Sequence, residues 1–95
     1  MLIRIVRMHF KEDRVEHFLK IFQENYKAIS GFSGCISVEL LRDAADPLCY
    51  CTVSRWDADN SLQAYRTSPL FESVWKTVKP MFGRKAEAFS LIDAL

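Results

Sequence analysis

The sequence predicts one α+β domain with the element order β-α-β-β-α-β, and three observations lead to this prediction. Four short segments are rich in the apolar and β-branched residues that favour strands. Two stretches between them repeat apolar residues at helical spacing. The chain of 95 residues is 49% hydrophobic with only three Gly and three Pro, which suits a single domain over residues 1–95 and excludes a disordered or fibrous chain.

The first elements are a strand and a long amphipathic helix. Leu2–Phe10 is rich in β-formers and stops at a charged cluster, in which Asp13 is the expected N-cap of a helix over residues 14–30. Gly31 and Gly34 are expected to end this helix, because glycine accepts a left-handed backbone. The apolar residues of the helix fall on one stripe, formed by Val15, Phe18, Leu19, Phe22, Tyr26 and Ile29.

The middle of the chain predicts an antiparallel hairpin. Residues 35–42 and 48–56 both have strand character, and the short polar segment 43–47 between them suits a turn. Residues 57–67 then suit a short helix.

A second helix is expected to begin at Ser68 and Pro69, because Ser is a favoured N-cap and Pro a favoured first helical residue. Pro80 should kink or end its last turn, Gly83 should close it, and residues 85–93 should form the last strand. The order is therefore the ferredoxin-like one, with a split second helix and an antiparallel sheet covered by helices on one face.

Both faces of the predicted hairpin are apolar, which is unusual for a sheet covered on one side only. One face would carry Ile36, Val38, Leu40 and Tyr50, and the other Leu41, Cys49, Cys51 and Val53. A second copy of the chain is the most economical cover for the second face, so we expect a homodimer formed through the sheets.

Charge and cysteine usage limit the partners and the compartment. Thirteen Lys and Arg against twelve Asp and Glu give a net charge of +1, too balanced for nucleic acid or an anionic membrane to be the main partner. No apolar run is long enough for a membrane span or a signal peptide. The cysteines are three, an odd number, and Cys49 and Cys51 are too close in one strand to bridge easily, so we expect reduced thiols in a cytoplasmic protein.

Several common sites are absent from the sequence. The Cys49-x-Cys51 pair lacks the spacing of a zinc knuckle and has no histidine at ligand spacing, so no metal site is expected. No Gly-rich run precedes a helix, which excludes a phosphate loop. The strand at 48–56 lacks the glycine and the basic start of an RNA-recognition motif.

A run of residues after the third strand carries a resemblance to a known family. Within this run the positions that match the family are Trp56, Leu62, Tyr65, Arg66, Ser68 and Phe71. Two earlier pairs, Gly34-Cys35 and Arg42-Asp43, match it as well. Over essentially the whole chain, the pattern resembles antibiotic biosynthesis monooxygenase domains. The resemblance implies a dimeric α+β barrel and a cofactor-free oxygenase of quinols or anthrones, although the family also includes haem-degrading oxygenases and small isomerases.

Two departures from the family pattern bear on the reaction. Many oxygenase members carry His where this chain has Tyr65, so that histidine is missing. Similarity to the haem-degrading branch places Trp75 where that branch has its iron-ligating His, and Trp does not ligate iron. We therefore expect neither haem nor any other cofactor.

The candidate catalytic residues are Tyr65, Arg66 and His9. Tyr65 is interpreted as a hydrogen-bond donor or base toward a substrate oxygen, and Arg66 as the partner of a phenolate. The alternatives are a core tyrosine and a solvated arginine. His9 is either a general base or a polar residue at the rim of the dimer interface.

Four aromatic residues are candidates for binding a flat substrate. Trp56, at the expected mouth of a pocket, and Trp75 are interpreted as stacking walls, with plain core packing as the alternative. Tyr50 and Phe71 complete the predicted substrate-binding set. The predicted function is oxidation of a small quinol-like aromatic, the alternatives being a non-catalytic binding or stress-associated module and a small isomerase.

Overall fold

The computed structural model describes all residues 1–95 and contains one four-stranded antiparallel sheet. The strand order β2-β3-β1-β4 is that of a ferredoxin-like domain, as the sequence predicts. The strands are β1 (Leu2–Phe10), β2 (Cys35–Arg42), β3 (Cys49–Trp56) and β4 (Phe82–Leu91).

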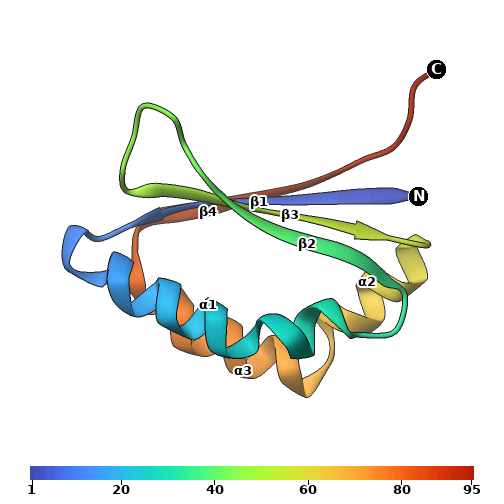
Figure 1. Ribbon diagram of the computed structural model, residues 1–95, viewed down its shortest axis with the longest axis horizontal. Coiled ribbons are helices and arrows are strands. Elements are labelled where there is room, and N and C mark those ends of the chain that lie inside the picture. The colour runs from blue at the N-terminus through green and yellow to red at the C-terminus, as the bar shows by residue number, and fades with distance from the viewer.

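Three α-helices cover one face of this sheet and leave the other face bare (Figure 1). They are α1 (Val15–Ser30), α2 (Asp59–Arg66) and α3 (Pro69–Val78), so the expected split of the second helix is confirmed. Two single 3-10 turns, η1 (Glu12–Arg14) and η2 (Lys79–Met81), join helices to strands. No helix combines the length and the apolar composition that crossing a membrane requires.

The two ends of α1 differ from the prediction in detail. Asp13 is not an N-cap, because it lies inside η1 and its side chain makes no capping hydrogen bond. Gly31 follows the helix with φ of −89°, whereas the left-handed backbone occurs at Gly34, with φ of 86°. A Cβ at Gly34 would lie 2.2 Å from Oγ of Ser61, so this loop can pack against α2 only as glycine.

Helix α3 starts where the sequence predicts, but it ends at Val78, before the predicted end at Gly83. Ser68 caps the helix, since its Oγ accepts a hydrogen bond from the Phe71 N–H at 3.2 Å. Pro80 lies in η2, where it ends the helix. Gly83 does not close the helix, because β4 already begins at Phe82 and pairs Phe82 with Phe10 of β1.

The core lies between the sheet and the helices. One buried hydrophobic cluster of this core consists of Met8, Phe10, Phe18, Val78 and Met81. The rings of Phe10 and Phe18 stack with centroids 4.1 Å apart, which ties β1 to α1.

The open face, by which we mean the side of the sheet away from the helices, has an apolar centre. Ile5 of β1 pairs with Val53 of β3 and with Phe89 of β4, and Ile3 pairs with Leu91. Phe89 is 44% exposed and Leu91 46% exposed in the single chain. The structure thus confirms that apolar residues gather on this face.

One residue of the predicted inner face is wrongly placed. The register of β2 against β3 shifts between Cys35 and Ser37, so Ile36 sits at a bulge and is 57% exposed. Beyond the bulge, Val38 is buried and Leu40 packs against the core as predicted.

Candidate functional site

A cavity of about 250 Å³ lies between the covered face of the sheet and the helices. Eighteen residues line it and fourteen of them are hydrophobic, so its interior is largely dry. The sheet contributes Val6, Val38 and Thr52, among others, and the helices contribute residues such as Phe22 and Val74.

Four aromatic side chains form a continuous row along the cavity. Tyr65 of α2 lies between Trp56 and Phe71, with ring centroids 5.2 Å from each. Phe71 in turn stacks on Trp75 at 5.8 Å, with the two rings within 10° of parallel. The structure therefore brings together Trp56, Tyr65, Phe71 and Trp75, four of the residues that the sequence singles out.

Trp56 is an inner wall of the cavity rather than part of its mouth. The residue has no exposed surface, and its Nε1 donates a hydrogen bond of 2.9 Å to Oγ of Ser54. Because this bond satisfies the indole N–H, Trp56 offers a ligand its ring face.

Tyr65 is held in its protonated form. Burial among the aromatic rings raises the pKa of Tyr65 to about 12, and Cys35 adds to the shift. A phenol with this pKa keeps its proton at neutral pH. Tyr65 is therefore suited to donate a hydrogen bond and is unsuited to act as a base.

Arg4 and Arg66 are the only charged residues that line the cavity. Nη1 of Arg4 donates to Oγ of Ser90 at 3.1 Å, and Nη1 of Arg66 donates to Oε1 of Gln63 at 3.3 Å. Burial lowers the pKa of Arg4, and the nearby positive charge of Arg66 lowers it further. The cavity thus combines apolar walls with two neighbouring guanidinium groups.

Arg4 lines the cavity although it is not among the residues predicted from the sequence. The signal is present in the strand alternation, because Arg4 shares a face of β1 with Val6 and Met8, which line the same cavity. A charged residue at such an inward position is uncommon and suggests a partner in the interior.

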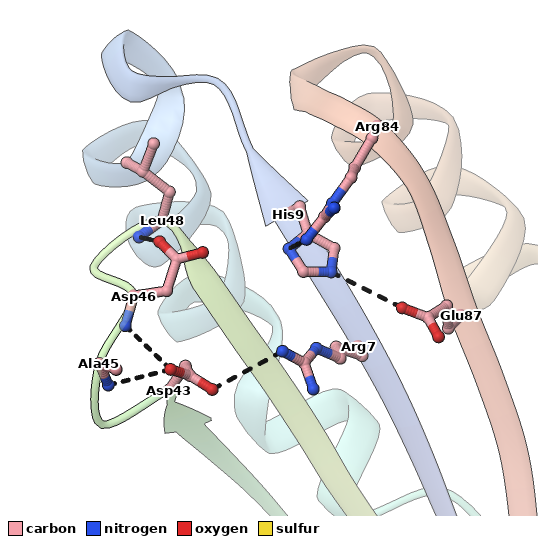
Figure 2. A network of polar contacts seen from close by, with 8 residues as sticks. All are labelled: Arg7, His9, Asp43, Ala45, Asp46, Leu48, Arg84 and Glu87. Atoms are coloured by element: carbon pink, nitrogen blue, oxygen red, sulfur yellow. Dashed lines mark hydrogen bonds and ion pairs between the residues drawn. The ribbon is translucent and has the colours of Figure 1, made fainter.

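His9 lies on the other side of the sheet from Tyr65 and Arg66, so the structure does not bring the three predicted catalytic residues together. Figure 2 shows His9 on β1 between two residues of β4, Arg84 and Glu87. Nη2 of Arg84 is 3.0 Å from Nδ1 of His9. Since a guanidinium only donates, Nδ1 accepts and the ring proton is on Nε2, 3.7 Å from the Glu87 carboxylate.

The rest of the network in Figure 2 holds the β2–β3 hairpin. The Asp43 carboxylate accepts hydrogen bonds from the backbone N–H groups of Ala45 and Asp46, at 2.9 and 2.8 Å, and these bonds lower the pKa of Asp43. Arg7 approaches the same carboxylate at 3.7 Å. These contacts account for the turn, so we assign this cluster a structural role.

Tyr50 also lies outside the cavity, contrary to its predicted place in the substrate-binding set. Its ring packs against Phe10 and Phe18, with centroids 6.0 and 6.1 Å away. Tyr50 therefore belongs with the core at the other end of α1 from Ile29.

Metal-binding groups are scarce in this fold. No cluster of three or more His, Cys, Asp or Glu side chains has the geometry to hold a metal ion. None of these residue types lines the cavity, and the three cysteines are unpaired. The absence of a cofactor stays a prediction.

Solved structures with the same fold are numerous, and all those compared here share little sequence with the chain. An antibiotic biosynthesis monooxygenase has 15% identity and a TM-score of 0.92, with both chains covered completely. The protein Rv0793 from Mycobacterium tuberculosis has 18% identity and a TM-score of 0.88, covering 97% of this chain and 93% of its own. A conserved protein from Methanosarcina mazei Go1 has 17% identity and a TM-score of 0.89, with 96% and 91% covered. No curated protein matches the chain in sequence.

A sequence profile of a protein family matches most of the chain and is stronger evidence of family membership than these structural similarities. Residues 1–76 match the profile described as Antibiotic biosynthesis monooxygenase, and this span includes β1 to β3, α2 and the whole aromatic row. The chain therefore belongs to the antibiotic biosynthesis monooxygenase family.

Proposed function

We propose that the cavity binds a small flat aromatic compound and that the domain oxidises it as a cofactor-independent monooxygenase of quinol-like substrates. The row formed by Trp56, Tyr65, Phe71 and Trp75 is the main support, because it offers ring faces beside a protonated hydroxyl. A cavity of about 150 Å³ holds one benzene ring. The 250 Å³ of this cavity therefore suits one ring or two fused rings.

In the proposed reaction, a hydroquinone loses a proton and its phenolate reduces O2. One oxygen atom adds to a ring carbon, and the other leaves as water with the two hydrogens that the ring compound gives up, so a hydroquinone becomes a hydroxyquinone. Tyr65 donates a hydrogen bond to a substrate oxygen, Arg66 stabilises the phenolate, and the apolar walls keep out bulk water. Arg66 is exposed, so the proton can leave to solvent beside it.

A non-catalytic binding module is the second candidate, and one observation favours it. No carboxylate or imidazole lines the cavity, and Tyr65 with its raised pKa does not serve as a base. A substrate that ionises readily would still react, whereas a weakly acidic ligand would be bound without turnover.

We also propose that two copies of the chain pair through the open face. Its apolar centre, which includes Ile5, Val53, Phe89 and Leu91, has no cover within the chain. The ion pair between Arg55 and Glu39 flanks this centre with both charge signs, which suits a self-complementary two-fold contact. The three unpaired cysteines further support a cytoplasmic location.

Oxygen uptake with a panel of hydroquinones tests the enzymatic proposal. The wild-type protein should consume O2, and Tyr65→Phe should lower the rate by about 100-fold, the usual loss for one transition-state donor. Tyr26→Phe is the matched control, because Tyr26 is 43% exposed on α1 and does not line the cavity. Binding without uptake would favour the binding module, and neither binding nor uptake would refute both candidates.

A further inference from the structure

We propose that the compound this cavity takes carries a permanent carboxylate, held between the guanidinium groups of Arg4 and Arg66. The inference rests on the proposed function, since it names the chemical class of the ligand for the same cavity. Its aromatic body would lie against the row that contains Trp56 and Tyr65.

Both arginines of the cavity lack a carboxylate partner within the chain. Of the other five arginines, three form ion pairs: Arg7 with Asp43, Arg14 with Asp13, and Arg55 with Glu39. Arg42 and Arg84 form none either, but they do not line the cavity. Arg4 and Arg66 form no ion pair and donate only to the neutral oxygens of Ser90 and Gln63.

The positive charges of Arg4 and Arg66 also act on each other. Arg66 contributes to the lowered pKa of Arg4, after burial, which means that the two guanidiniums repel each other across the cavity lining. Asp59 opposes this effect, but it does not line the cavity, and its Oδ1 already accepts from Nε2 of Gln63 at 3.3 Å. An anion placed between the two arginines would remove the repulsion.

A phenolate and a carboxylate carry the same single charge, but they differ in how long the charge is present and in the number of oxygens that share it. A phenolate that forms during turnover is a single, transient charge, and Arg66 alone is sufficient to stabilise it. A carboxylate has two oxygens and can accept hydrogen bonds from both guanidinium groups throughout the time that the ligand is bound. Since Arg66 is exposed and Arg4 is partly buried, the carboxylate would sit where the cavity reaches solvent, and the apolar ring would point inward.

Isothermal titration calorimetry with a matched pair of ligands tests this proposal. The pair is naphthoate and its neutral counterpart naphthalenemethanol, which share the same fused rings. We expect the wild-type protein to bind naphthoate at least about 10-fold more tightly. The double variant Arg4→Gln and Arg66→Gln should lose this preference and keep its affinity for the neutral compound. Arg14→Gln, which removes a positive charge away from the cavity, should bind both ligands as the wild type does.

A salt series on the wild-type protein supplies a test that needs no variant to fold. Raising the salt from about 0.05 M to about 0.5 M should weaken naphthoate binding and leave naphthalenemethanol binding unchanged. Equal affinity for the two ligands, unaffected by salt and by the Arg4 and Arg66 substitutions, would overturn the carboxylate inference and leave aromatic binding intact. Failure of both ligands to bind would overturn the inference and the proposed function together.

Discussion

The indole Nε1 of Trp56 donates its hydrogen bond to the hydroxyl of Ser54, at 2.9 Å, inside a cavity whose lining is otherwise almost entirely apolar. Both residues come from β3, and Trp56 has no exposed surface. The bond fixes the ring that forms the inner end of the aromatic row.

Replacing Ser54 should therefore destabilise the domain. Ser54→Ala leaves the buried indole N–H without a partner, and we expect the free energy of unfolding in urea to fall by about 1–3 kcal/mol. Ser73→Ala, an exposed change on α3, should stay within about 0.5 kcal/mol of the wild type. A Ser54→Ala protein as stable as the wild type would show that this hydrogen bond does not stabilise the fold.

The loop before β2 should tolerate only glycine at position 34. Gly34→Ala forces a left-handed alanine and places a Cβ against Ser61, so we expect a loss of at least about 2 kcal/mol in urea unfolding. Adding Ser61→Gly should recover the part of the clash that Ser61 causes, while the strain of the positive φ and the approach of Asp57 Oδ1, 2.8 Å from the added Cβ, remain. If the double variant were no more stable than Gly34→Ala alone, the contact with Ser61 would not be the cause.

The hydroxyl of Tyr65 should lose its proton only at a pH well above the ordinary tyrosine pKa of 10.0. Its pKa is raised from 10.0 to about 12 in the folded state, so the stabilising effect is complete below about pH 10 and is lost as the pH rises through about 12. At about pH 11, relative to neutral pH, this difference removes about 1 kcal/mol of stability from the wild type. Tyr65→Phe has no phenol at this position and should not lose this stability. The difference in free energy of unfolding between the wild type and Tyr65→Phe should therefore change by this amount between neutral pH and about pH 11.

Ultraviolet absorption checks the same pKa directly. Of the three tyrosines, one should ionise near pH 12, and this step should be missing in Tyr65→Phe. A wild-type titration curve without a step near pH 12 would contradict the burial of the Tyr65 hydroxyl.

A charge on the open face should prevent pairing of two chains. Phe89→Glu places a carboxylate in the apolar centre of that face, and we expect sedimentation at micromolar concentration to give a monomer. The wild type and Ala28→Glu, a change on the exposed side of α1, should sediment at twice the mass of the chain. A wild-type protein that sediments as a monomer would refute the proposed dimer.

Local signals in the sequence were sufficient to predict the elements. The Ser68-Pro69 pair marks the start of α3 because both residues satisfy or remove unpaired N–H groups of the first turn. The period of two in Leu2–Phe10 gives β1 with its observed bounds. The bulge at Ile36 could not be predicted, because it depends on how β2 registers against β3.

The site was predicted less completely, since it depends on which faces meet. Trp56, Tyr65, Arg66 and Phe71 are close in sequence and converge on one cavity. Arg4 joins them only through the pairing of β1 with β3 and β4.

His9 and Tyr50 are predicted site residues that lie outside the cavity; His9 is on the face expected to form the dimer interface, and only Tyr50 departs from its predicted place. Both have chemistry suited to a site, but His9 faces the open side of the sheet, among Arg84 and Glu87. Tyr50 is on the covered side, but its ring packs against Phe10 and Phe18 and not into the cavity. Residue type alone does not separate such positions from the cavity.

The most direct test of the account is an N–H NMR spectrum of the protein titrated with naphthohydroquinone in the absence of oxygen. The only two tryptophans of the chain line the cavity, so their two indole signals report on it without further labels. We predict saturable shifts of both indole signals and of the Tyr65 and Arg66 amides, with the Ile5 and Val53 amides unmoved. Indole signals that stay in place, or shifts confined to Ile5 and Val53 on the open face, would contradict the claim that this cavity is the ligand site.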